Sequence, residues 1–179
     1  MRADLLDKPY FYTLQEHLPT RRKQLEAWAA LTLAHFQREG VREFSRGRME
    51  ADDFALFNNA QIRRRLNAEF VRLLLQELKT AGKIEFRDAA EDVFFVYTHN
   101  VEELAEAIHK WARDSGRTNR IETLLFLAGD EETKGQIFWG YPVEVLLKAA
   151  RFLAAKGRAD VIELEERSSA AKMGVKFKA

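Results

Sequence analysis

The chain repeats one order of secondary-structure elements, and this repeat limits the folds open to it. In each half, the apolar pattern predicts an amphipathic helix that ends at a glycine and two short strands that follow it. The two glycines, Gly82 and Gly157, lie 75 residues apart, a spacing that suits two small domains. Glycine is common at helix ends, so the repeated order carries more weight than the glycines alone. The sequence therefore predicts two domains of the same construction, with a boundary near residues 99 and 100.

The first half is predicted to contain three helices and a hairpin. Before the hairpin the predicted segments are, in chain order, a helix from Thr20 to Gly40, an extended stretch at Phe44, a loop over 52–59, a short helix over 60–66 and a helix that Asn67 caps and Gly82 ends. Two strands, 84–86 and 93–97, follow on either side of an acidic turn. Three helices followed by a two-stranded wing are the order of elements in a winged helix.

The second half has the same order. Its predicted segments are a helix that Asn100 caps, an apolar run over 121–127, an acidic polar loop over 129–136, a helix over 142–157 and strands over 161–164 and 175–177. We therefore expect an α+β fold of two tandem winged-helix domains, mainly helical with a β-hairpin wing in each. The expected division is an N-terminal tail over 1–19, a first domain over 20–99 and a second domain over 100–179.

Three aromatic residues follow a proline in the N-terminal tail. Pro9, Tyr10, Phe11 and Tyr12 carry a large apolar area, although chain ends are normally polar and mobile. Aromatic side chains provide contact area at a low cost in side-chain entropy, which makes them good interface anchors. Two interpretations stay open: Phe11 and Leu14 cover the chain's own core, or the four residues dock on a partner.

Charge and composition argue against several classes of protein. The 29 basic and 28 acidic residues nearly cancel, whereas nucleic-acid-binding proteins usually carry a basic excess. The chain has no cysteine, which excludes disulfides and thiolate zinc sites and fits a reducing compartment. No apolar run reaches the roughly 20 residues that span a bilayer, and the acids near the N-terminus argue against a signal peptide. These features together favour a cytoplasmic protein.

Candidate catalytic and metal-binding residues are sparse in this sequence. The four histidines, His17, His35, His99 and His109, are scattered, and no two have the four-residue spacing of a helical metal site. The acidic run over 130–132 lacks the alternating ligand spacing of a calcium loop, and the isolated glycines form no phosphate-binding loop. The sequence therefore predicts no catalytic residue, cofactor or metal, and a small hydrolase is disfavoured.

A transcription regulator with tandem winged helices is the main alternative, because this fold often binds DNA through its third helix. In the first domain that helix exposes Glu69 beside Arg72, and the wing turn over 88–92 is acidic. In a DNA complex, the acidic groups of the helix and of the wing would be repelled by the phosphates. The third helix of the second domain, which carries Lys148, is more permissive. The arginine run over 63–65 has two interpretations: it forms a solvated helix face, or it binds the acidic residues of a partner or lipid headgroups.

The second domain contains a concentrated group of aromatic residues. Phe138, Trp139 and Tyr141 precede a helix, and the apolar pair at 125–126 lies nearby in sequence. Winged-helix cores are small, so part of this group would remain exposed and could receive the apolar face of a partner helix. A core with one exposed tryptophan is the other interpretation. We expect Phe126, Phe138, Trp139 and Tyr141 to contact a partner.

Short motifs along nearly the whole chain resemble those of one family. In chain order they are Pro9–Gln15, Thr20-Arg21, Lys23-Gln24-Leu25, Trp28, Leu56-Phe57-Asn58-Asn59, Leu75-x-Glu77-Leu78 before Gly82, Ser115-Gly116, Thr123-Leu124, Phe138-x-Gly140, Leu146-Leu147 and Gly174-Val175-Lys176-Phe177. As an ordered set they are similar to the vacuolar protein sorting-associated protein 25 family, the small two-copy subunit of the ESCRT-II complex. The family usually has two adjacent prolines before the aromatic residues, and here Tyr10 stands in the place of the second.

The resemblance implies a role in assembly and no catalysis. It implies that the tail and the first domain bind the two larger winged-helix subunits of ESCRT-II, and that the second domain binds the ESCRT-III subunit that nucleates filament assembly. The expected location is the cytoplasm, with recruitment to endosomal or other membranes as part of the complex. The resemblance implies only an indirect contact with the membrane, no cofactor and no nucleic acid.

Overall fold

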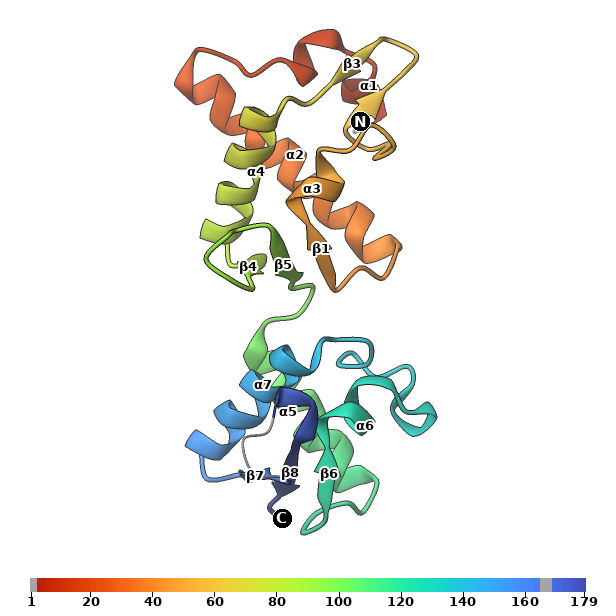
Figure 1. The fold of residues 1–179 in the computed structure, drawn as a ribbon, viewed down its shortest axis with the longest axis vertical. Helices are drawn as coiled ribbons and strands as arrows, with labels where there is room; N and C mark the ends of the chain where they lie inside the picture. Colours follow the sequence, from red (N-terminus) through yellow and green to blue (C-terminus); the bar gives the residue numbers. More distant parts are fainter. Residues whose placement is uncertain (1–2, 165–168) are drawn as a thin grey trace. The chain divides into compact units, whose positions relative to one another are not determined.

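Each half of the chain builds a winged helix, which confirms the predicted α+β class (Figure 1). The computed structural model describes residues 3–164 and 169–179. The chain divides into two units, Met1–Thr98 and His99–Ala179. The segment that the sequence sets apart as an N-terminal tail is part of the first unit.

The first unit contains three core helices and a three-stranded sheet. Its elements are α1 (Ala3–Leu6), the 3-10 helix η1 (Pro9–Tyr12), α2 (Leu18–Arg38), β1 (Glu43–Ser45), α3 (Arg46–Met49), β2 (Asn58–Asn59), β3 (Arg64–Arg65), α4 (Ala68–Thr80), β4 (Ile84–Phe86) and β5 (Val93–Val96). The antiparallel sheet has the order β1-β5-β4, and the wing is the hairpin β4–β5. The strands predicted at 84–86 and 93–97 are therefore confirmed to within one residue.

The prediction of a short helix over residues 60–66 is wrong. The segment forms the hairpin β2–β3, in which Asn59 pairs with Arg64. The side-chain oxygen of Asn59 accepts hydrogen bonds from the amides of Gln61 (3.0 Å) and Ile62 (3.4 Å), a turn that competes with helix formation. Arg63 adopts the left-handed conformation (φ 51°), which ends any helix. The second helix of the winged helix is instead α3, which is too short to show an apolar period.

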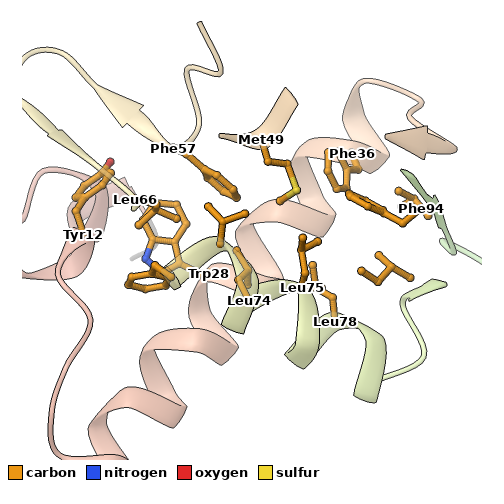
Figure 2. Packing of buried hydrophobic residues seen from close by; sticks show 14 of the residues in the cluster. Tyr12, Trp28, Phe36, Met49, Phe57, Leu66, Leu74, Leu75, Leu78 and Phe94 are labelled. Carbon is orange, nitrogen blue, oxygen red and sulfur yellow. The ribbon is translucent and has the colours of Figure 1, made fainter. Parts of the chain in front are cut away.

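The core of the first unit lies between α2 and α4 (Figure 2). Asn67 caps α4 as predicted, because its side chain accepts a hydrogen bond from the amide of Phe70 (2.8 Å). The predicted buried face of α4 is confirmed at Phe70, Val71, Leu74, Leu75 and Leu78. From α2, Trp28 and Phe36 are fully buried against them.

The second unit repeats the arrangement. Its elements are α5 (Val101–Asp114), β6 (Ile121–Thr123), α6 (Leu124–Gly129), η2 (Glu131–Thr133), α7 (Val143–Ala155), β7 (Ala159–Glu163), η3 (Ala170–Lys172) and β8 (Met173–Phe177). The antiparallel sheet has the order β6-β8-β7. The predicted cap at Asn100 is confirmed and extends to a capping box with Glu103. The apolar run over 121–127 divides at Thr123, which ends β6 and caps α6.

Candidate docking surfaces

The N-terminal aromatic segment folds back onto the first unit. The ring of Phe11 stacks on the indole of Trp28, with 4.7 Å between centroids and 12° between planes. Tyr12 meets the same indole edge-on at 5.3 Å. Phe11 is 3% exposed and Tyr12 is 5% exposed. Both rings therefore belong to the core that Trp28 anchors.

Side chains of α2 also hold the backbone of this segment. Trp28 Nε1 donates a hydrogen bond to the carbonyl of Phe11 (2.9 Å). The amide of Gln24 donates to the carbonyls of Phe11 (3.0 Å) and Thr13 (2.9 Å), and its own oxygen accepts from the amide of Gln15 (3.2 Å). Arg21 Nε donates to the carbonyl of Gln15 (2.6 Å). These contacts satisfy buried backbone groups and fix the segment in one path.

Tyr12 joins the segment to the hairpin β2–β3. Burial raises the pKa of Tyr12, and a hydrogen bond with the Asn59 side chain opposes part of that rise, while the charge of Asp7 adds to it. Asn59 Nδ2 also donates to the carbonyl of Leu6 (3.0 Å). The hydroxyl of Tyr12 therefore stays protonated, and Asn59 links α1 to the rest of the unit.

The structure separates the four predicted tail residues into two pairs. Phe11 and Tyr12 face the chain's own core, which corrects the expectation that all four face a partner. Pro9 is exposed and Tyr10 is 58% exposed, so these two remain free to contact another protein. Leu18, at the start of α2, is 70% exposed, and the sequence reasoning did not single it out.

The second unit separates its four predicted residues in the same way. Phe138 and Tyr141 are buried, which corrects their assignment as contact residues. Trp139 is 38% exposed and Phe126 is half-buried. Leu125 is 56% exposed, and Ile137, which the sequence reasoning missed, is 37% exposed. We call Leu125, Phe126, Ile137 and Trp139 the second-unit apolar surface.

An arginine holds the aromatic residues beneath this surface. The guanidinium of Arg117 lies over the rings of Phe126 (4.8 Å) and Trp111 (5.4 Å). The same group pairs with Glu122 at 2.9 Å and with Glu132. These carboxylates, Glu122 first, raise the pKa of Arg117. Arg117 therefore fixes α6 to the end of α5 by charge and by ring contact.

A groove of about 460 Å³ borders the second-unit apolar surface. Its lining mixes charged and apolar groups: Lys110, Trp111, Asp114, Glu132, Gln136 and Ile137. Lys110 pairs with Asp114 on the exposed face of α5. A partner with an apolar stripe and a polar edge matches such a surface.

The described residues hold no arrangement that points to catalysis. Within residues 3–164 and 169–179, no three histidine or acidic side chains gather where they could hold a metal ion. The histidine side chains of α2 and its N-cap make local hydrogen bonds, His17 with Thr20 (2.9 Å) and His35 with Arg38 (3.0 Å). In the same part of the chain, no helix is long and apolar enough to cross a membrane. The features that stand out are the exposed apolar side chains of the two units.

His109 is buried in α5 near the C-terminal strand. Its Nε2 donates to the carbonyl of Lys178 (3.1 Å), and its Nδ1 accepts a hydrogen bond from Arg158 (2.9 Å). Burial lowers the pKa of His109 most, and the charge of Arg158 lowers it further; the hydrogen bond to the Lys178 carbonyl opposes this fall, with smaller effects from Arg113, which lowers the pKa, and Glu106, which raises it. The folded chain therefore favours the neutral imidazole.

The stability of the chain should depend on pH through His109. Because its folded pKa lies below the usual 6.5, the unfolded chain binds more protons below that pH. The stabilisation is complete above about pH 6.5 and is lost as the pH falls toward the folded pKa. We expect His109→Gln to flatten the rise in unfolding free energy that the unchanged chain shows as the pH increases toward about 6.5, measured by urea denaturation. His17→Gln, at an exposed position, is the control, and equal flattening in both variants would contradict the assignment.

Comparison with known proteins places the chain in a family. A family model described as "ESCRT-II complex subunit" matches residues 5–142. Relatives named vacuolar protein-sorting-associated protein 25 from Xenopus laevis, Homo sapiens and Drosophila melanogaster are 33%, 33% and 35% identical over 94% of this chain and cover 93%, 92% and 92% of their own length.

Solved structures share the fold over the same extent. One is described as "Crystal structure of subunit VPS25 of the endosomal trafficking complex ESCRT-II"; it has a TM-score of 0.80 at 23% identity and covers 94% of both chains. Another, "Structure of the ESCRT-II endosomal trafficking complex", has a TM-score of 0.78 at 22% identity and covers 94% of this chain and 95% of its own. The family model spans most of the chain, and the curated relatives align with nearly all of it. The chain belongs to the family of ESCRT-II complex subunits.

Proposed function

We propose that this chain is a non-catalytic subunit of an ESCRT-II complex in endosomal sorting and membrane remodelling. Its membership of the family over nearly its full length carries the proposal. One matched structure is described as the "endosomal complex ESCRT-II (VPS22/VPS25/VPS36)", so a relative assembles with two other subunits. The chain acts by geometry: each unit presents one surface to a different partner.

The first unit docks on the two larger winged-helix subunits. Phe11 and Tyr12 hold the N-terminal segment on Trp28, and Pro9 and Tyr10 project from it. The ordered path lowers the conformational entropy that Tyr10 loses on binding, and its ring supplies the contact area of a central anchor. Leu18, at the start of α2, is a further exposed apolar side chain of the same unit.

The second unit recruits an ESCRT-III subunit and so nucleates ESCRT-III assembly. Leu125, Ile137 and Trp139 are exposed large side chains on one unit, a condition that favours the apolar face of a partner helix. The ion-paired Arg117 keeps Phe126 in place beneath them. The chain itself reaches endosomal membranes only through the complex, and it needs no cofactor for this role.

The DNA-binding alternative has little support. The wing turn of the first unit carries Asp88, Glu91 and Asp92, which would lie against phosphates in a duplex complex. The curated relatives are named as vacuolar sorting proteins. We therefore expect no specific affinity for nucleic acid.

Two exposed aromatic residues test the proposal reciprocally. Tyr10→Ala should weaken binding to the larger ESCRT-II subunits about tenfold or more and leave ESCRT-III binding within about twofold. Trp139→Ala should weaken ESCRT-III binding about tenfold or more and leave binding to the larger ESCRT-II subunits within about twofold. Calorimetry of the full chain with each partner measures both affinities, and each variant is the control for the other.

Two results would overturn the proposal. One is the absence of binding by the unchanged chain to the larger subunits, together with a steeply salt-dependent affinity for duplex DNA. The other is an equal loss of both affinities in both variants. A shared defect in folding would then explain the losses, and two separate docking surfaces would not be needed.

A further inference from the structure

The first unit has a small basic pocket where α4 meets the wing. The pocket has a volume of about 90 Å³ and is lined by Arg46, Arg72, Leu75, Gln76, Phe86 and Glu91. None of these residues belongs to the surfaces proposed above. Helix α4 packs on both α3 and β4, so three elements converge at this point (Figure 1).

The fold brings the polar groups together from separate elements. Arg72 and Gln76 lie four residues apart on the exposed face of α4, so their side chains are neighbours. Arg46 begins α3, and its backbone amide donates to the carbonyl of Asp92 (2.8 Å), which ties that end of α3 to the wing. Phe86 ends β4 and closes the pocket with an apolar wall.

The two arginine side chains have unused hydrogen-bond donors, although Arg46 is ion-paired with Glu50. Among residues 3–164 and 169–179, the side chain of Arg72 makes no ion pair or hydrogen bond. Arg46 Nε lies 4.0 Å from Glu50 Oε1, a distance too long for a hydrogen bond. Glu91 also lines the pocket, but Lys79 binds its carboxylate at 2.8 Å. Two guanidinium groups with unused donors therefore line one pocket.

The other charged groups near the pocket, Asp92 and Lys79, already have partners. The carboxylate of Asp92 accepts a hydrogen bond from the backbone amide of Gly47 (3.0 Å), at the start of α3. Lys79 lies over the ring of Phe86 at 5.2 Å while it binds Glu91. The wing acids would repel a long polyanion, whereas a single anionic group needs only the pocket that Arg46 and Arg72 both line.

We propose that this pocket binds one glutamate side chain of an acidic segment in a protein partner. Arginine forks match the two oxygens of a carboxylate, and the amide of Gln76 can donate a further hydrogen bond. A volume of about 90 Å³ is roughly three times the share of one liquid water, enough for a carboxylate and its methylene groups. Leu75 and Phe86 provide the apolar wall for the methylenes. A duplex phosphate backbone fits less well because the wing is acidic.

Nuclear magnetic resonance of the full chain tests this site without any ESCRT partner. The probe is N-acetyl-glutamate α-amide, followed through the side-chain N–H signals of the arginines and of Gln76. We expect saturable shifts in the millimolar range. The glutamine analogue of the probe should bind about tenfold more weakly or worse, because it lacks the charge.

Matched variants show whether the pocket is responsible. Arg72→Gln should weaken probe binding about tenfold, whereas Arg64→Gln, which removes another exposed arginine, in β3, should stay within about twofold. Shifts that rise linearly without saturation would overturn the proposal. So would an equal loss in Arg64→Gln, or inorganic phosphate at matched ionic strength binding more tightly than the probe, because the site would then be a general anion site.

Discussion

Replacement of Trp28 by alanine is expected to lower the free energy of unfolding by about 3–5 kcal/mol, the usual cost of removing a buried tryptophan. Trp28 is fully buried, and its ring contacts Phe11, Tyr12, Phe57 and Phe70 with centroid separations of 4.7 to 6.3 Å. Figure 2 shows it within the cluster of the first unit, near Tyr12, Leu66 and Phe57. The substitution removes this packing together with the indole N–H, which donates a hydrogen bond to the carbonyl of Phe11.

The exposed Trp139 provides the matched control. Urea denaturation should show Trp139→Ala, at a residue 38% exposed, losing about 1 kcal/mol or less. Hydrogen exchange at the amide of Gln15, which donates to Gln24, should accelerate in Trp28→Ala as the N-terminal segment detaches. Trp28→Phe keeps most of the packing and loses the hydrogen bond to Phe11, so about 1–2 kcal/mol is expected. Equal destabilisation by Trp28→Ala and Trp139→Ala would contradict the central place of Trp28.

Local signals in the sequence predicted most of the regular structure. The caps at Asn67 and Asn100 depend on residues three positions away, and the apolar period of α4 extends over one continuous segment. The strands of the wings follow from short apolar runs. Each of these features is stabilised largely by neighbours in sequence, so one sequence is sufficient to locate it.

Two features were harder to predict, one because its local signal is ambiguous and one because it depends on a distant residue. The hairpin β2–β3 forms because Asn59 bonds the turn and Arg63 takes a left-handed conformation, and the consecutive arginines resemble a helix face in sequence. The burial of Phe11 depends on Trp28, seventeen positions away. In sequence, a buried aromatic residue and an interface aromatic residue look the same, so the candidate surfaces were predicted only in part.

Replacement of Glu122 by alanine is expected to lower the free energy of unfolding by about 2–3 kcal/mol, because a largely buried guanidinium loses its buried partner. Glu122 lies in β6 with a side chain 10% exposed, and that of Arg117 is 19% exposed. Their separation is 2.9 Å. Glu132 also binds Arg117, but its side chain is 62% exposed and water competes for it, so it compensates only in part.

The measurement is urea denaturation with two comparison variants. Glu122→Gln keeps the shape and an acceptor, so it should lose about 1 kcal/mol. Glu131→Ala removes an exposed partner of Lys134 at 3.1 Å and should change stability by about 0.5 kcal/mol or less. A loss in Glu122→Ala no larger than in Glu131→Ala would mean that Arg117 is held by the rings of Phe126 and Trp111 and not by charge. In the expected case, loss of Glu122 also frees Arg117 from Phe126, so the second-unit apolar surface should lose affinity for its partner along with stability.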